Sequence, residues 1–189
     1  MDNFLSSMAV KYAPQIDWSK YYPEEFIYSI PFNGVTGTSA GSQYTGSLNI
    51  SSDASFIVTE ICRAFRTEPD FSTLTGAGSL LYEPNTAAPN MFLQMVDSGA
   101  GKSLFDNPIS VNSIFNPNTG TWKLAAPRIL GANTSLQTTL ISYDTVNTWN
   151  VQLAFKGVKI YPRVGIIDPT PNESQLKQIA RSLLILAGG

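Results

Sequence analysis

Histidine is absent from the sequence, and cysteine occurs only once. Without imidazole, Ser-His-Asp and Cys-His nucleophile systems cannot form, and His-based zinc sites are excluded as well. The single cysteine, Cys62, cannot close a disulfide within one chain or hold an iron–sulfur cluster. Because Cys62 lies inside an apolar run, we expect it to act as a small, buried hydrophobic side chain. We therefore expect a protein that is not an enzyme and that binds no metal or other cofactor.

Charged residues are scarce. They make up 14% of the chain, well below the usual quarter, and the net charge is −2. The lysines and arginines are scattered, whereas a nucleic-acid interface needs clustered positive charge, so no nucleic-acid partner is expected. Hydroxyl and amide side chains take the place of charge. Such a neutral surface suits a protein that contacts other protein surfaces.

Long apolar runs are missing too. No window approaches the roughly 18 apolar residues that indicate a membrane-spanning helix. The start, MDNFLSSMAVKYAPQ, has neither the basic region nor the long apolar stretch of a signal peptide. The sequence therefore predicts no membrane span and no signal peptide.

Residues 1–25 are predicted to form an extended N-terminal arm, because Pro14 and Pro23 interrupt regular structure. Aromatic side chains crowd this segment, and they are expected to pack on the chain's own domain or on a neighbouring chain. The sequence leaves these two alternatives open. The candidate protein-contact residues of the arm are Phe4, Tyr12, Trp18, Tyr21 and Tyr22.

Strand patterns dominate the middle of the chain. Short β-rich or apolar runs at 26–30, 55–65, 91–96 and 109–115 indicate strands, several of them bounded by proline or glycine. Residues 66–90 contain several prolines and glycines and predict a long irregular connection.

The clearest alternation comes in the last third. Residues 136–140 and 149–155 alternate apolar and polar side chains, which predicts two half-buried strands joined by a hairpin loop at 142–148. Gly157 interrupts the second strand and predicts a bulge or kink.

A C-terminal helix is predicted from residue 171. Thr170 supplies an N-cap, Pro171 the first helical position and Glu173 a capping box. The apolar residues that follow fall on one stripe at helical spacing, and the last of them widen that stripe, which indicates burial on two sides. The candidate protein-contact residues here are Leu183, Leu184, Ile185 and Leu186.

Together these patterns predict an all-β antiparallel sandwich of the jelly-roll type, with an N-terminal arm and one C-terminal amphipathic helix. The expected parts are the arm at 1–25, the β-sandwich at 26–166 and the helical segment at 167–189.

Motifs that would indicate catalysis are weak. Gly99–Ser103 lacks the earlier glycine of a phosphate loop and fits a turn. Glu60 lies in an apolar strand, where Arg63 or Arg66 could pair with it, and a structural ion pair explains it better than catalysis. Trp122 lies beside a loop and is the candidate surface aromatic for stacking on a sugar ring.

The stretch Pro127–Leu136, followed by Asn150–Ile160, resembles the C-terminal half of small jelly-roll proteins of bacteriophage particles, over roughly 108–161. The resemblance implies a structural virion protein, such as a capsid decoration, cement or minor capsid protein. It implies self-association, a trimer being one arrangement, and binding to other virion proteins such as a major capsid protein. It also implies synthesis in the host cytoplasm and a final location in the virion.

The sequence leaves two other functions open. A receptor- or glycan-binding β-domain on a tail or spike would use an exposed aromatic platform at Trp122 or Tyr82. A carboxylate-dependent hydrolase would need two acids converging in a cleft, and no signature of such a pair occurs in the sequence.

Overall fold

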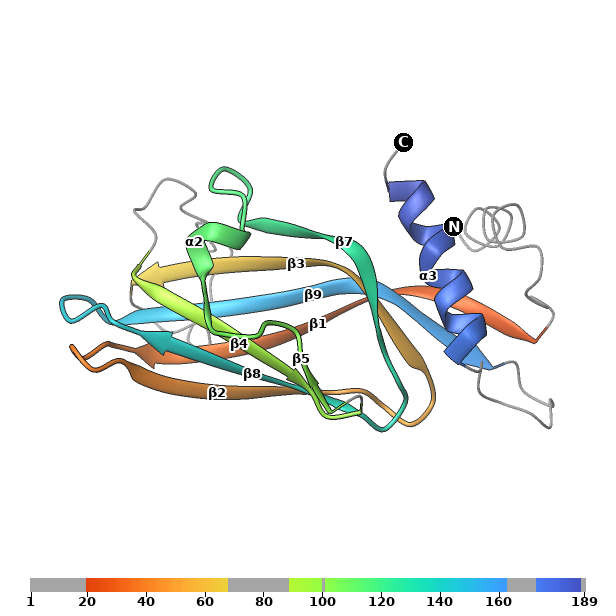
Figure 1. Ribbon diagram of the computed structural model, residues 1–189, viewed down its shortest axis with the longest axis horizontal. Helices are drawn as coiled ribbons and strands as arrows, with labels where there is room; N and C mark the ends of the chain where they lie inside the picture. The colour runs from red at the N-terminus through yellow and green to blue at the C-terminus, as the bar shows by residue number, and fades with distance from the viewer. Residues whose placement is uncertain (1–19, 68–88, 100, 163–172, 188–189) are drawn as a thin grey trace, which may run out of the picture.

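The chain folds as two packed antiparallel sheets with one long helix on the outside of one sheet (Figure 1). The computed structural model describes residues 20–67, 89–99, 101–162 and 173–187, with the α3 side chains described at 174–181. The strands are β1 (Tyr21–Val35), β2 (Ser42–Asn49), β3 (Ser55–Thr67), β4 (Met91–Asp97), β5 (Lys102–Ser103), β6 (Ile109–Ser110), β7 (Thr121–Leu130), β8 (Ser135–Ser142) and β9 (Trp149–Pro162). The helices are α2 (Val111–Ile114) and α3 (Glu173–Ala187).

The strand pairings are nested. β1 pairs with β9, β2 with β8, β3 with β7, and β4 with the short strands β5 and β6. The outcome is one long two-stranded ribbon wrapped into two sheets, sheet A with the order β1-β9-β3-β7 and sheet B with the order β2-β8-β4-β5. This wrapping is that of a jelly roll, so the predicted fold class is confirmed.

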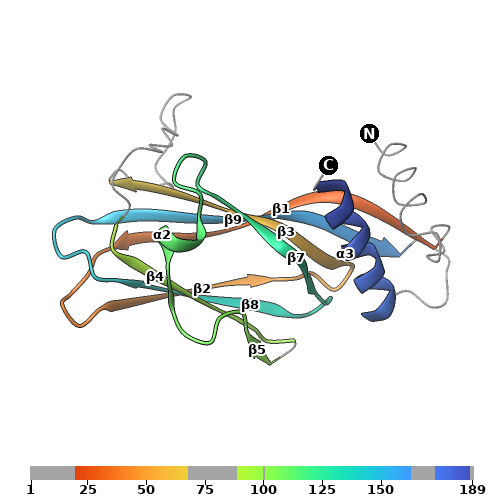
Figure 2. The ribbon, with the colours of Figure 1, turned by 45° about the horizontal axis from the view of Figure 1, so that its top comes forward.

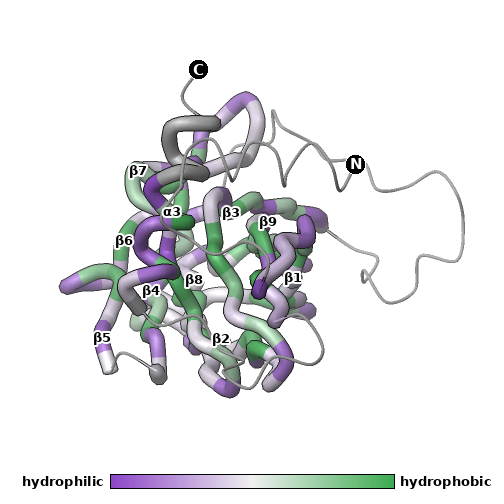
Figure 3. Tube along the Cα trace, turned by 90° about the vertical axis from the view of Figure 1, so that its right-hand side faces the viewer, coloured by the Kyte–Doolittle hydropathy of each residue, from purple (hydrophilic) through white to green (hydrophobic). Residues whose placement is uncertain are grey.

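The main core lies between the sheets, as the end-on view in Figure 3 shows. Alternate residues of β3, β4, β8 and β9 point inward and supply most of it, as period-two alternation requires. Its largest fully buried members include Phe56, Leu93, Met95, Leu140 and Phe155.

A second, smaller core lies on the outer face of sheet A beneath α3 (Figure 2). Leu176, Ile179 and Ala180 of the helix are buried there, which confirms the predicted apolar stripe. They pack against Ile57 and Ile160, from adjacent strands. Glu173 is the first described helical residue, and the predicted cap at 170–172 lies outside the described residues.

The prediction for the start of the sheet was too short. β1 begins at Tyr21, within the segment assigned to the arm, and continues through Pro31 to Val35. Prolines are tolerated because β1 is an edge strand, where an outward-facing position needs no N–H donor. The side chain of Tyr21 is buried in the second core.

Residues 109–115 do not form the predicted strand. β6 ends at Ser110, and a single helical turn carries the chain to Phe115, whose N–H donates to the Val111 carbonyl. The apolar residues Val111 and Phe115 are four apart, so one helical turn directs both into the main core.

The irregularity predicted at Gly157 lies in the neighbouring strand. β9 continues without interruption through Gly157, and the register shifts in β3, between Val58 and Glu60. A Cβ atom at residue 157 would overlap the carbonyl oxygen of Ile57. Glycine is therefore required here by the close approach of two backbones.

We expect Gly157→Ala to lower the free energy of unfolding by about 3 kcal/mol or more, because the overlapped group is backbone and cannot rotate away. Gly131→Ala is the matched control, since a Cβ there would meet only the Thr134 methyl at an ordinary 3.5 Å. Urea denaturation measures both. Equal effects of the two substitutions would contradict the close approach.

Candidate interaction surface

In the described strands β2, β8 and β4 of sheet B, no charged side chain points to the outer face. Side chains on β2, β8 and β4 alternate between the main core and this outer face, and the strands are in register across the sheet. The outward residues define the neutral face: Gln43, Thr45, Ser47, Asn49, Phe92, Gln94, Val96, Ser135, Gln137, Thr139 and Ile141. Because amides and hydroxyls lose less hydration energy than ions, this face costs comparatively little to bury against a partner.

Sheet A presents a different outer face. One cross-strand row runs from Ile27 through Lys156 and Glu60 to Lys123, and it carries three charges. Lys156 Nζ lies 3.9 Å from Glu60 Oε1. The Glu60 ion pair expected from the sequence therefore exists, although its partner comes from β9 rather than from Arg63 or Arg66.

Arg63 points to the opposite side of sheet A. Its guanidinium lies 4.8 Å from the centre of the Phe65 ring and within 3.4 Å of Asn112 Oδ1, and its side chain is buried at the edge of the main core. Cys62 is half-buried and donates to Glu60 Oε1 at 3.4 Å. Burial raises the pKa of the Cys62 thiol, which keeps it neutral.

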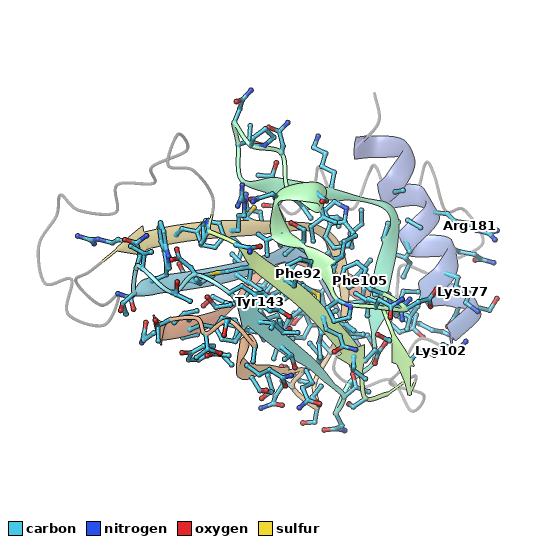
Figure 4. All side chains as sticks on the ribbon, turned by 60° about the vertical axis from the view of Figure 1, so that its left-hand side comes forward. Phe92, Lys102, Phe105, Tyr143, Lys177 and Arg181 are labelled. Carbon is cyan, nitrogen blue, oxygen red and sulfur yellow. The ribbon has the colours of Figure 1, made fainter. Side chains whose placement is uncertain are left out.

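An apolar spot lies at one end of the neutral face. Phe92 and Ile141 are cross-strand neighbours, and the Phe92 ring meets the Tyr143 ring edge to face, with centroids 5.6 Å apart (Figure 4). Tyr143 is 37% exposed. Aromatic rings of this kind, with one apolar side and one polar tip, are frequent at protein interfaces.

The loop that follows Tyr143 is held in one shape by Asp144. Its carboxylate accepts from the Trp149 indole N–H at 2.7 Å and from the backbone N–H groups of Val146 and Asn147 at 3.0 and 3.1 Å. The Asp144 carbonyl also accepts from Gly37, which ties this loop to the β1–β2 connection. The result is a pre-shaped tip with Val146 86% exposed, at the end of the sandwich away from α3 (Figure 1).

Asp144 has a lowered pKa. Burial alone raises the pKa of this carboxyl, but the hydrogen bonds from Trp149, Val146 and Asn147 favour the charged form and outweigh it. A depressed folded-state pKa means that the carboxylate stabilises the fold above its ordinary pKa of 3.8, and that this stabilisation is lost as the pH falls through the lower, folded-state value.

The structure buries one lysine at the other end of the main core. Lys159 is 5% exposed, and its ammonium lies 4.1 Å from the centre of the Phe26 ring and 5.1 Å from that of Tyr28. It also donates to Ser51 Oγ at 3.0 Å. Cation–π contacts and a hydrogen bond thus compensate the buried charge, which is a structural role.

The candidate contact residues from the sequence lie in different places. Tyr22 is 41% exposed and stacks on Tyr161, with ring centroids 5.1 Å apart, while Tyr21 is internal. Trp122 is half-buried, with its ring stacked on Phe105 at 5.6 Å. The other candidates lie outside what the structure describes. These are the residues Phe4, Tyr12 and Trp18 and the side chains of Leu183, Leu184, Ile185 and Leu186.

Among the side chains that the structure describes, no group of three or more Cys, Asp or Glu is placed to hold a metal ion. Within the same ranges, no helix has the length and apolar character needed to cross a membrane.

No protein-family model matches the chain, and no curated protein sequence matches it. Among solved structures, it is similar to VP2 in the subviral particle of infectious bursal disease virus, with a TM-score of 0.31 and 13% identity over 76% of this chain and 37% of that chain. It is also similar to dimeric latent PorU from Porphyromonas gingivalis, with a TM-score of 0.27 and 13% identity over 73% of this chain and 13% of that one. The chain thus spans well under half of either protein, and these TM-scores are too low to support a functional conclusion.

We expect Asp144→Ala to lower the free energy of unfolding by roughly 1–3 kcal/mol at neutral pH, because several donors lose a charged acceptor. At a pH low enough to protonate Asp144 in the folded protein, the difference from the wild type should shrink. Denaturation followed by tryptophan fluorescence at several pH values measures this. The exposed Asp106→Ala variant is the control, and an equal loss there would contradict the assignment.

Proposed function

We propose that this chain is a non-enzymatic structural protein of a virus particle. It self-associates and docks on a capsid shell, as a decoration, cement or minor capsid protein does. The observation that carries the proposal is the neutral face, the uncharged outer surface of β2, β8 and β4 on a jelly-roll domain. The partners are further copies of the chain, in a trimer or another homo-oligomer, and a major capsid protein.

The physical basis is the low cost of covering this face. The cores of protein–protein interfaces are depleted in charged residues, because an ion that is removed from water must find a partner. The neutral face contains no ion, and its apolar spot at Phe92 and Tyr143 offers surface that gains free energy when it is covered. Assembly by burial needs no titrating or catalytic group.

The aromatic arm and the apolar end of α3 are the other proposed contacts. The arm would extend from the outer strand β1 close to α3, where Tyr22 and Tyr161 already form an exposed stacked pair. In this proposal the protein is made in the host cytoplasm and ends in the virion.

The second candidate is receptor or glycan binding on a tail or spike. The pre-shaped Asp144 loop favours it, because a rigid tip with an exposed Val146 binds without an ordering cost. The half-buried position of Trp122, stacked on Phe105, gives this candidate less support than an open aromatic platform would.

Light scattering on the purified chain tests self-association. We expect a mass above that of the 20.5 kDa monomer, and a lower mass for a variant that lacks residues 1–19. The deletion stops at residue 19 so that Tyr21 keeps its place in the second core. A monomer at every concentration, which also fails to co-sediment with capsid shells, would contradict the proposal.

A glycan array separates the two candidates. We expect no binding by the wild type. If binding is found, Trp122→Phe tests the platform, because phenylalanine retains the packing on Phe105 but offers a smaller ring. Sugar binding that is lost in Trp122→Phe while the melting temperature stays within a few degrees would favour the second candidate.

A further inference from the structure

Three of the four described edges of the sandwich are protected against pairing with another strand. β1 contains Pro23 and Pro31, which cannot donate to a new ladder, and carries the adjacent charges of Glu24 and Glu25. β7 contacts α3 and contains Pro127. On the β4 side of sheet B, β5 and β6 are only two residues long. Short, charged, proline-containing or covered edges are the usual means of preventing strand addition.

Within the described residues, β2 has none of these protections. Its eight residues, Ser42–Asn49, contain no charge and no proline, and they pair with β8 without a register shift. In the described part of the chain, no other strand pairs with it. Its outward side chains are exposed, and they belong to the neutral face.

The backbone of β2 is partly exposed at Gly46. This residue has no side chain, so its intermediate exposure is that of backbone atoms. A Cβ atom at this position would overlap the Ile30 side chain, which means that β1 covers the inner face of β2 here. Unpaired backbone N–H and C=O groups on such an edge form a template for an additional strand.

We propose that β2 pairs antiparallel with β2 of a second copy of this chain across a two-fold axis, so that two copies of sheet B form one continuous sheet. The inference rests on the proposed function, because it identifies the surface through which the protein self-associates. It would give the assembly a paired building block whose neutral faces lie side by side.

A second copy fits this edge because the strand is compatible with itself. In a two-fold contact the same surface meets itself, so a charge close to the axis would face its own copy. β2 carries no charge and meets no such repulsion in any register, whereas Glu24 and Glu25 of β1 would repel in a register centred near them. Because side chains alternate between the two faces of a strand, the two copies of β2 must pair so that their core-facing side chains lie on the same side of the joined sheet. A two-fold axis that passes through Thr45 or through Gly46 satisfies this condition and pairs the largest number of β2 residues.

The first experiment introduces a charge of either sign at the centre of the β2 edge. Thr45 is exposed, so Thr45→Lys and Thr45→Glu should fold normally. Each variant alone should dimerise about tenfold more weakly or worse than the wild type, because two like charges meet across the axis. An equal mixture of the two variants should restore dimers, since opposite charges then face each other. Sedimentation velocity over a range of concentrations measures all three samples.

Gln137→Lys is the matched control. Gln137 is exposed on the same face but lies on β8, one strand inside the edge, where a pairing strand does not reach it. Dimerisation should be unchanged in this variant. Equal weakening by Gln137→Lys and Thr45→Lys, without rescue in the mixture, would overturn edge pairing and favour stacking of the neutral faces.

Cross-linking tests the register in a Cys62→Ser background. Thr45→Cys should form an intermolecular disulfide on oxidation if the axis passes at Thr45, and Thr45→Cys mixed with Ser47→Cys should do so if it passes at Gly46. If neither cross-links while the wild type self-associates, edge pairing is wrong and the proposed function stands. A wild type that remains monomeric, alone and with capsid shells, would overturn both.

Discussion

Sheet A depends on one close backbone contact, where Gly157 of β9 passes against the Ile57 carbonyl of β3. β9 is held between β1 and β3 along nearly its whole length, so this contact sits at the centre of the sheet. On one side of the contact Phe155 enters the main core, and on the other Val158 enters the core beneath α3. The register shift in β3 lies opposite this glycine. Because side chains of β9 alternate between the two faces of sheet A, the same strand serves both cores.

Among the described residues, few charges lie on the three longer strands of sheet B. Sheet A carries the Lys156–Glu60 pair on its outer face, and Lys159 is compensated by aromatic rings at its inner edge. The one charged residue in β2, β4 and β8 is Asp97, which is buried, accepts from the Gly99 N–H and lies 3.9 Å from Arg128 of β7. That ion pair, in which the Arg128 side chain is 36% exposed, joins the two sheets. The neutral face is thus a feature of how charge is distributed between the sheets, beyond the low overall charge of the sequence.

Sequence periodicity predicted the elements whose burial is regular. The strands β8 and β9 and the α3 stripe follow from alternate or helical spacing of apolar residues. The hairpin predicted between these two strands was wrong, because β8 pairs in sheet B and β9 in sheet A, so the loop at 142–148 crosses from one sheet to the other. β7 was not predicted as a strand, because its register against β3 jumps from Arg128 to Lys123 and leaves the intervening residues without alternation. The unprotected edge could not be predicted either, since an edge is defined by long-range pairing, and β2 becomes an edge only once β8 has paired with its other side.

The two kinds of proposed contact lie on different sides of the sandwich. α3 covers part of the outer face of sheet A, and Tyr21, where β1 begins, is packed in the same outer core. The neutral face and the β2 edge belong to sheet B, on the other side of the main core (Figure 3). A subunit with contacts on one side alone forms a closed pair, whereas one with contacts on two sides can pair and still bind a third surface. This separation is what a protein needs if it is both to associate with its own copies and to dock on a shell.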